Sequence, residues 1–329
     1  MKVVKLYEIG SPEVLVVEEC DIPELGSNEV LIKVANIAIN YSEIQQRKGT
    51  YPYPTPLPIT MGQWGVISGE VVGIGVGVHT ISIDSKVVAQ VPSGSYAEYV
   101  VVPAYLLIPI SERVDHMAIT ALLTQGQTAY HALKTVGNIK HGETVLIHAA
   151  TGGLGNIAVQ IAKAYGAGKV IATVGSQEKV NHTLSIGADV GINYSEENWT
   201  EKVIQVTEGK GADLILQSVG GKVLEESIQV LASFGRLIYI GSASSHNSNW
   251  DKLDLVNILS NKTVIGFNIA NLLSSRPELV GEALESMLSL MISNQLRPQI
   301  KYIFSLSDVK KAHELIESRQ SIGTVILQP

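Results

Sequence analysis

Three glycines in one short run are the residues of this chain best suited to hold a phosphate group. Gly152, Gly153 and Gly155 follow the apolar stretch 144–150 and precede a segment whose apolar residues recur at helical spacing. Such a turn lets the backbone approach a pyrophosphate, and a helix that begins there directs its N–H groups at the phosphates. The glycines alone fit a structural turn equally well. The order of strand, glycines and helix favours a dinucleotide site in which Gly152, Gly153 and Leu154 make the contacts.

The end of the next apolar stretch indicates which dinucleotide is bound. A site for NAD usually carries Asp or Glu about 20 residues after the glycines, where the carboxylate binds the ribose 2′-hydroxyl and would repel a 2′-phosphate. This chain has Gly175 and Ser176 at that turn, and Lys179 follows in the expected helix. A hydroxyl and a positive charge suit a phosphate, so we expect NADPH rather than NADH. The alternative is that Lys179 is an ordinary solvated helix residue.

Cysteine and histidine are too sparsely placed to build a zinc site. Cys20 is the single cysteine, which excludes an intramolecular disulfide, and we interpret it as a small apolar residue of an early strand. The eight histidines include no His-x-x-x-His spacing that would put two ligands on one helical face. The sequence therefore predicts no protein-built metal site.

Composition limits the classes of partner. At 329 residues the chain exceeds the size at which one core keeps growing, so two domains are expected. A net charge of -7 without clustered Lys and Arg argues against nucleic acid. No apolar run approaches the roughly 20 residues that a membrane span needs, and the first residues do not resemble an export signal. We expect a cytoplasmic protein with a small-molecule substrate.

The chain divides into two parts that differ in their predicted secondary structure. Residues 2–120 are rich in β-branched runs separated by Gly and Pro, and the segment 49–61, with four prolines, is expected to be a stiff loop. From about residue 120, short apolar runs alternate with helical stretches, which indicates βαβ units and a parallel sheet. We predict an α/β protein with a doubly wound Rossmann sheet at 121–265, inserted in a discontinuous β-rich domain formed by 1–120 and 266–329.

Several motifs in the same order resemble the zinc-independent quinone oxidoreductase branch of the medium-chain dehydrogenase/reductase superfamily over nearly the whole chain. The motifs are Gly94-Ser95-Tyr96-Ala97-Glu98-Tyr99, the run His148 to Gly155, Ser176-x-x-Lys179, Asn40-Tyr41, Gly187-Ala188, Tyr194 and Gly235-Arg236. The resemblance implies a Rossmann domain beside a GroES-like domain, NADPH in the cleft, and a homodimer.

The resemblance also implies roles for residues outside the glycine turn. Tyr194 and Arg319 would contact the adenosine 2′-phosphate. Asn40, Thr128 and Ser242 would line the nicotinamide end of the cofactor site. Tyr51 is similar to the tyrosine that positions or protonates the substrate in enoyl reductases of this superfamily.

The sequence departs from the family's zinc-dependent members at the positions of the metal ligands. It has Asn40-Tyr41-Ser42 and Met61-Gly62-Gln63-Trp64 there, without the Cys, His and acid. We interpret Trp64 as a packing residue, with narrowing of the substrate cleft as the alternative. Thr324 stands where Lys is common, which weakens any expectation that this strand end contacts cofactor.

These features predict the kind of acceptor. Without a Lewis-acid metal a simple ketone is hard to polarise, so an activated acceptor is needed. Hydride transfer to a quinone, enone or enoyl thioester leaves an anion that a few hydrogen bonds stabilise, with Tyr51 as donor and Asn40 fixing the geometry. The first expectation is an NADPH-dependent quinone reductase. The alternatives are an enoyl or alkenal double-bond reductase and a catalytically silent NADPH-binding protein.

Overall fold

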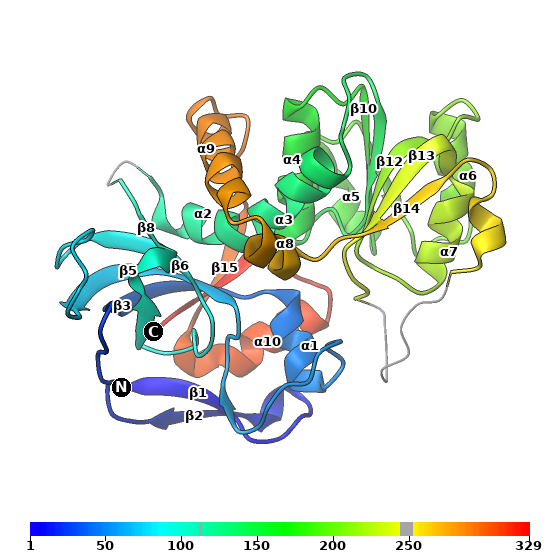
Figure 1. Ribbon diagram of the computed structural model, residues 1–329. Coiled ribbons are helices and arrows are strands. Elements are labelled where there is room, and N and C mark those ends of the chain that lie inside the picture. Colours follow the sequence, from blue (N-terminus) through cyan, green and yellow to red (C-terminus); the bar gives the residue numbers. More distant parts are fainter. Residues whose placement is uncertain (112–113, 244–252) are drawn as a thin grey trace. The chain divides into compact units, whose positions relative to one another are not determined.

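The computed structural model describes residues 1–111, 114–243 and 253–329, and the chain divides into two compact units. The first unit contains residues 1–124 and 299–329, and the second contains residues 125–298. The first unit is therefore discontinuous in sequence and the second is inserted in it. Figure 1 follows the chain through both units in sequence colours.

Two sheets form the first unit. The larger has seven strands in the order β15-β16-β3-β5-β6-β8, with β7 paired to β3, and the smaller has the order β2-β1-β4. The strands are β1 Lys2–Leu6, β2 Leu15–Glu19, β3 Glu29–Ala38, β4 Ile59–Thr60, β5 Gly65–Ile74, β6 Lys86–Val91, β7 Tyr99–Pro103, β8 Leu107–Pro109, β15 Ile300–Ser305 and β16 Thr324–Gln328. The helices are α1 Tyr41–Lys48, α2 His116–Ala121 and α10 Val309–Glu317, with 3-10 turns η1 Pro12–Val14, η2 Ala104–Leu106 and η6 Leu306–Asp308.

Strand β3 contributes alternate residues to the core of the first unit. Val30, Ile32 and Val34 are buried while the residues between them are more exposed, as expected for a strand with one face on a core. Helix α10 closes this core with Val309 and Ala312. The last turn of α10 and the helix α1 are thereby brought together.

The second unit is a doubly wound Rossmann sheet, as predicted. Its six strands are all parallel and lie in the order β11-β10-β9-β12-β13-β14, which is the 3-2-1-4-5-6 order of dinucleotide-binding domains. The strands are β9 Thr144–Ile147, β10 Lys169–Val174, β11 Val190–Asn193, β12 Ala212–Gln217, β13 Leu231–Tyr239 and β14 Thr263–Gly266.

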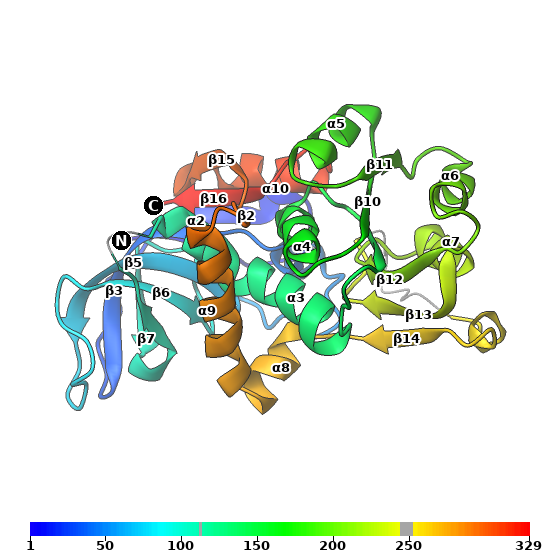
Figure 2. The same ribbon diagram turned by 90° about the horizontal axis from the view of Figure 1, so that it is seen from above.

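Helices cover both faces of this sheet. Because parallel crossovers are right-handed, α4 and α5 lie on one face and α6 and α7 on the other, as Figures 1 and 2 show. The helices of the unit are α3 Gln127–Tyr130, α4 Gly153–Ala164, α5 Gln177–Ser185, α6 Trp199–Val206, α7 Lys222–Gln229, α8 Ile269–Ser275 and α9 Glu278–Ile292. Shorter turns are the π-helical η4 His131–Val136 and the 3-10 turn η5 Leu255–Ile258, and the π-helical η3 Leu122–Gly126 contains the point where the chain passes from the first unit to the second.

The division into units differs from the expected domain boundary near residue 266. Residues 266–298 belong to the second unit, and the first unit resumes at residue 299. The physical reason is the packing of α9 on α3. Gln127 Nε2 donates to the Val280 carbonyl at 2.9 Å, and the Tyr130 hydroxyl donates to Ser286 Oγ at 3.4 Å.

None of the helices in the described ranges combines the length and the apolar character that crossing a membrane requires.

Candidate active site

The glycine turn joins β9 to α4 at the carboxyl edge of the parallel sheet. Gly152 is the N-cap of the 12-residue helix α4 and has no side chain that could cap its first N–H groups. A Cβ atom on Gly155 would lie 2.3 Å from the Ala149 carbonyl oxygen, so only glycine lets the helix approach the turn after β9 this closely. Asn156 Nδ2 fixes the turn by donating to the carbonyls of Gly152 and Gly153 at 2.8 and 2.7 Å. The helix N-terminus therefore suits an anionic ligand.

Gln125 supports this turn and was not identified from the sequence. A Cβ atom on Gly153 would lie 2.2 Å from Gln125 Oε1, so the buried amide packs directly against the glycine. Thr128 follows three residues later on α3 and is also buried. A lone glutamine in an apolar helical stretch gives no signal of this contact.

The turn after β10 carries the residues expected to select the cofactor. Gly175 is exposed, Ser176 is the N-cap of α5, and Lys179 lies in the first turn of that helix. Lys179 is half-buried, and burial lowers the pKa of its ammonium group while the neighbouring Glu178 opposes that shift. A partly desolvated cation interacts more strongly with an anion than a fully hydrated one. Glu178 itself is exposed.

Tyr194 lies beside Gly175, as a shared site requires. A Cβ atom on Gly175 would be 3.3 Å from the Tyr194 hydroxyl oxygen. Behind Tyr194, the buried His148 stands edge-on to its ring, with ring centres 6.4 Å apart. His148 Nδ1 and Nε2 pair with the hydroxyls of Thr173 and Ser227 at 2.7 and 2.8 Å. Burial lowers the pKa of His148 to about 3, so this imidazole is a neutral support.

Ser242 follows β13 at the same carboxyl edge of the sheet. It is 2% exposed, and its hydroxyl donates to the Val219 carbonyl at 3.3 Å. This bond joins the segment after β13 to the segment after β12. Apart from Thr128 on α3 and the residues of the first unit, the residues expected at the two ends of the cofactor thus lie along one edge of one sheet.

Asn40 belongs to the first unit, where it begins helix α1. It forms a capping box with Glu43, whose carboxylate accepts the Asn40 backbone N–H at 2.7 Å. Glu43 is fully buried and also accepts from the Tyr96 hydroxyl at 3.0 Å. Burial raises the pKa of Glu43 to about 8. The spacing Asn-x-x-Glu is the sequence signal for this pair, which was not among the residues expected from the sequence.

Tyr51 follows α1 and is half-buried. Its backbone N–H donates to the Gln45 carbonyl at 3.2 Å, and its ring packs edge-on against Tyr53 with centres 5.8 Å apart. Burial, and then the charge of Tyr53, raises the pKa of the Tyr51 phenol. Arg319, the third expected residue in this unit, is exposed just after α10.

Trp64, interpreted from the sequence as a packing residue, is partly exposed in the first unit. Its side chain is 48% exposed and its backbone has a φ of 55°, because Trp64 lies in the turn before β5. The turn is held through the backbone, since Trp64 N–H donates to Pro92 O and Trp64 O accepts from Gln90 Nε2, both at 3.2 Å. Within the described part of the chain, no three His, Cys, Asp or Glu side chains gather where they could hold a metal ion.

The arrangement in the second unit fits a dinucleotide. The close approach of backbone at Gly155, the helix N-terminus at Gly152 and the half-buried Lys179 supply a pyrophosphate cradle and a cation. When bound, a reduced nicotinamide dinucleotide supplies a hydride.

Comparisons with known proteins agree with this geometry. The family described as "Alcohol dehydrogenase GroES-like domain" matches residues 26–112, and "Zinc-binding dehydrogenase" matches residues 153–288. A quinone oxidoreductase of Pseudomonas aeruginosa is 31% identical over 331 residues, covering 100% of this chain and 99% of that protein. Quinone oxidoreductase 1 of Escherichia coli is 32% identical, with 99% of each chain covered.

A solved structure of Escherichia coli quinone oxidoreductase complexed with NADPH has a TM-score of 0.92 with this chain. The two chains are 30% identical, and the match covers 100% of each. Both the sequence and the fold are thus similar over the full length, which confirms the resemblance inferred from the motifs. The chain belongs to the quinone oxidoreductase branch of the medium-chain dehydrogenase/reductase superfamily.

Proposed function

We propose that this protein is an NADPH-dependent reductase that transfers hydride to a conjugated carbonyl acceptor, with quinones as the first candidate class. The observation that carries the proposal is the carboxyl edge of the second unit's sheet. There, strand β9 leads to the helix N-terminus at Gly152, which has no side-chain cap. Its neighbour in the sheet, β10, leads to the turn of Gly175, Ser176 and Lys179. The relatives named as quinone oxidoreductases, and the NADPH in one of them, support both parts of the proposal.

NADPH is favoured over NADH by the charges at the turn after β10. Gly152, Gly153 and Leu154 would bind the pyrophosphate through backbone N–H groups. Ser176, Lys179, Tyr194 and Arg319 would bind the 2′-phosphate, while Thr128, Ser242 and Asn40 would contact the nicotinamide end. The exposed Gly175 leaves room for the adenosine ribose because it has no side chain.

The proposed reaction requires few catalytic groups. Hydride transfer to a quinone or enone leaves negative charge on an oxygen, which one or two hydrogen-bond donors stabilise. Tyr51 is a suitable donor because a phenol, whose usual pKa of 10.0 burial raises further, is protonated at neutral pH. Asn40 is held by its capping box with Glu43, which fixes the start of the helix that precedes Tyr51.

The test of this function is consumption of NADPH, and separately of NADH, with matched panels of quinones and enones. We expect turnover of at least one quinone and a lower KM for NADPH than for NADH. NADPH binding without turnover of any acceptor would favour the catalytically silent protein. Turnover confined to enones would favour the double-bond reductase, for which the half-buried Tyr51 hydroxyl is the supporting observation.

We also propose that the enzyme works without zinc. The segments 40–42 and 61–64 lack the Cys and His ligands that zinc prefers. Metal analysis of the purified protein should find no stoichiometric zinc, and chelators should leave turnover unchanged. One tightly held zinc per chain would contradict this.

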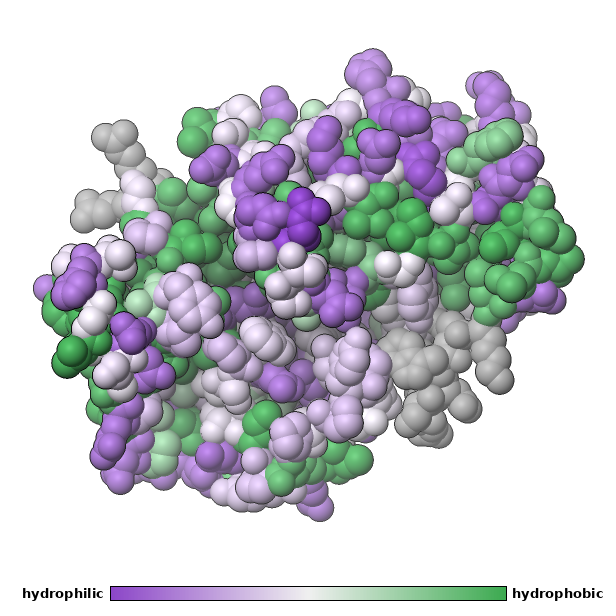
Figure 3. All heavy atoms as spheres, viewed as in Figure 1, coloured by the Kyte–Doolittle hydropathy of each residue, from purple (hydrophilic) through white to green (hydrophobic). Residues whose placement is uncertain are grey.

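A homodimer is the assembly that we propose. Strand β14 ends the sheet order of the second unit, so its outer edge can pair with another strand. Beside it, Leu255, Val256 and Leu259 of the η5 region are 69, 60 and 78% exposed. Figure 3 shows hydrophobic residues gathered at the right-hand edge of the view, where the yellow segment that precedes β14 lies in Figure 1. A second copy of the same edge would cover these side chains and pair β14 with β14.

A further inference from the structure

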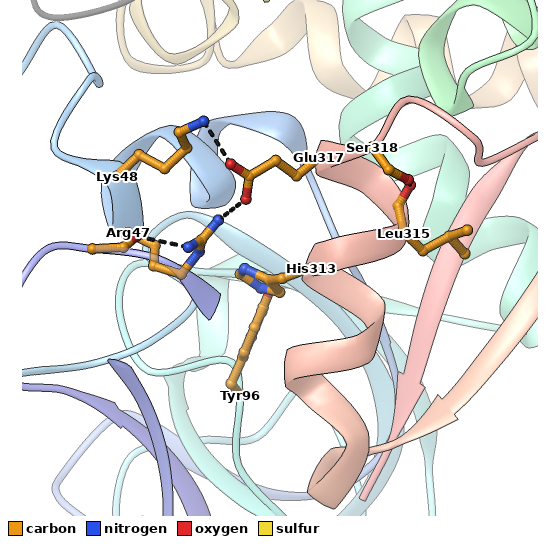
Figure 4. Close-up of polar contacts among 8 residues, drawn as sticks. Arg47, Lys48, Tyr96, His313, Leu315, Glu317 and Ser318 are labelled. Atoms are coloured by element: carbon orange, nitrogen blue, oxygen red, sulfur yellow. Dashed lines mark hydrogen bonds and ion pairs between the residues drawn. The ribbon is translucent and has the colours of Figure 1, made fainter. Parts of the chain in front are cut away.

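One carboxylate joins the ends of two helices in the first unit. Glu317 is the last residue of α10, and it accepts from the guanidinium of Arg47 and from Lys48 Nζ, the latter at 2.6 Å. Both cations lie in the last turn of α1. Figure 4 shows the two basic side chains converging on Glu317 from one helix.

Burial makes this junction rigid. The Arg47 side chain is fully buried, and its second terminal nitrogen donates to the Gly10 carbonyl at 2.7 Å. A buried guanidinium that loses its carboxylate keeps its desolvation cost without compensation, so the pair resists separation. The nearby cations hold the pKa of Glu317 below its usual range against the opposing effect of burial, so the carboxylate stays charged.

The junction lies between two residues with proposed roles. Arg319 follows Glu317 by two residues in a left-handed backbone conformation with a φ of 59°, and its N–H donates to the Ile316 carbonyl at 3.0 Å. On the other helix, Tyr51 follows Lys48 by three residues and is tied to the same helix through the Gln45 carbonyl. The helix itself begins at Asn40.

We propose that Glu317 is a positioning residue that holds the Arg319 turn against helix α1 and so sets both the preference for NADPH and the placement of Tyr51. The proposal rests on the proposed function, in which Arg319 binds the 2′-phosphate and Tyr51 donates to the substrate. Glu317 touches neither ligand in this scheme. It acts through the two helices that it joins.

The direction in which NADPH affinity changes distinguishes a positioning role of Glu317 from a purely electrostatic one. A carboxylate two residues from Arg319 repels a 2′-phosphate, so removing its charge should strengthen NADPH binding if Coulomb interaction alone mattered. If Glu317 instead holds Arg319 in place, its removal weakens NADPH binding. A merely structural role predicts a lower melting temperature and no change in the ratio of the two cofactor affinities.

The experiment is titration of NADPH and NADH into Glu317→Gln by fluorescence, with kcat and KM measured for a quinone and an enone. We expect Kd for NADPH to rise about two- to thirtyfold, the range produced by changes along a contact network. Kd for NADH should not change, and kcat with the enone should fall. Glu317→Asp, which keeps the charge on a shorter side chain, should recover part of the loss.

Two further sets of variants make the test decisive. In the Arg319→Ala background, Glu317→Gln should cause no further change in the NADPH to NADH ratio, because two residues acting through one contact are not additive. Because Glu317→Gln strands a buried cation, Arg47→Met/Glu317→Leu replaces the pair by apolar side chains that a folded core accepts. This double variant should also lose NADPH preference.

The matched control is Glu143→Gln. Glu143 accepts from Arg236 at 3.0 and 2.8 Å and is likewise partly buried, but it precedes β9 at the sheet edge opposite the glycine turn. Glu143→Gln should leave the ratio of the NADPH and NADH affinities unchanged. A wild-type protein that prefers NADPH, together with folded Glu317 variants that keep this preference or bind NADPH more tightly, overturns the positioning role alone. A wild-type protein without NADPH preference overturns the proposed function, and the positioning role with it.

Discussion

The phenol of Tyr51 is protonated at neutral pH, as any phenol with a pKa of 10.0 or above is, and burial raises its pKa further. This residue can therefore donate a proton but cannot accept one. Its backbone is fixed to α1 through the Gln45 carbonyl, which limits the space that the hydroxyl can sample. A donor held in this way stabilises the anion formed by hydride transfer more than it stabilises the neutral substrate. That difference is what accelerates the reaction.

Tyr51→Phe should therefore lower kcat with enones by about ten- to a thousandfold, the usual effect of losing one transition-state donor. The loss with quinones should be smaller, because a hydroquinone anion is intrinsically more stable than an enolate. NADPH binding should not change. Tyr53→Phe, at the exposed ring that packs on Tyr51, is the control and should leave both substrates unaffected. Equal losses for both substrates with a lower melting temperature would mean that Tyr51 only supports its loop.

Lys179 is the second residue whose charge can be tested in isolation. Lys179→Ala should raise Kd for NADPH about ten- to a hundredfold, since a hydrogen bond to a charged group contributes ~1.5–3 kcal/mol. Kd for NADH should stay the same because NADH has no 2′-phosphate. Lys163→Ala removes a cation from the far end of α4, where Lys163 pairs with Asp189, and should change neither affinity. Equal losses for both dinucleotides in Lys179→Ala would refute its assignment.

Among the helices, Gly155 and Gly281 differ in the space that a side chain would have. On α4, a Cβ atom at Gly155 would meet backbone atoms of Ala149 and Ala150 at 2.3 and 2.7 Å. On α9, a Cβ atom at Gly281 would find no described atom within 4 Å apart from its own helix and chain neighbours. The first glycine is required by packing of the cofactor turn, and the second weakens its helix without a packing reason.

Gly155→Ala should lower the free energy of unfolding by about 1–3 kcal/mol through overpacking and weaken NADPH binding. Gly281→Ala should instead raise the free energy of unfolding by about 1 kcal/mol, the difference in helix propensity. Denaturant titration of both variants measures the two effects on one scale. Stabilisation by Gly155→Ala would show that α4 does not need its close approach to the turn after β9.

At the scale of the whole molecule, three buried groups limit stability from opposite sides of the pH range. Burial, joined for His313 by the positive charge of Arg47, lowers the pKa of His148 and His313 to about 3 from 6.5. Below pH 6.5 the unfolded chain therefore binds protons that the folded chain does not, and stability falls. Glu43 behaves oppositely, because its pKa of about 8 makes the folded chain keep a proton that the unfolded chain releases above pH 4.5. Between pH 4.5 and 6.5 the two histidines outweigh the single carboxyl, so these groups together favour greatest stability near pH 6.5.

Glu43→Gln should remove the alkaline part of this dependence. The amide can accept from the Asn40 N–H and the Tyr96 hydroxyl as the protonated acid does, but it does not titrate. Relative to the unmutated protein, the variant should gain ~1.4 kcal/mol of unfolding free energy per pH unit as pH rises. The window for this gain runs from 4.5 to about 8. Parallel stability curves across this window would show that Glu43 is charged in the folded protein.

The proposed dimer can also be tested by mutation. Leu255→Lys/Leu259→Lys places two cations among the exposed apolar side chains beside β14, so it should convert a dimer into a monomer. Light scattering after size-exclusion chromatography measures the change in mass. Val76→Lys, at a site in the first unit that is 85% exposed, is the control and should leave the dimer intact. A monomer in the unmutated protein, or a dimer in the double variant, would contradict the proposed edge.

The sequence alone determined the parallel sheet because its signals are local. The six parallel strands lie in the part of the chain where apolar runs alternate with helical stretches, and the glycine turn follows β9 as expected. Apolar periodicity and glycine placement act within a few residues, so they can be recognised without knowing the fold. The same reasoning extended β9 to residue 150, whereas the strand ends at Ile147, because Ala149 and Ala150 form the turn beneath Gly155.

Only the tertiary structure decided which distant residues support the candidate site. Glu43 meets Tyr96, and Arg47 meets Glu317, across separations of 53 and 270 residues. The assignment of α9 to the second unit likewise depends on its contact with α3, made across 153 residues by Gln127 and Val280. A buried ion pair leaves no periodic signal in the sequence, because each charged residue looks like a solvated surface residue until its partner is known. The sequence therefore determined where a dinucleotide can bind, and the fold decided which buried charges hold helix α1 in place.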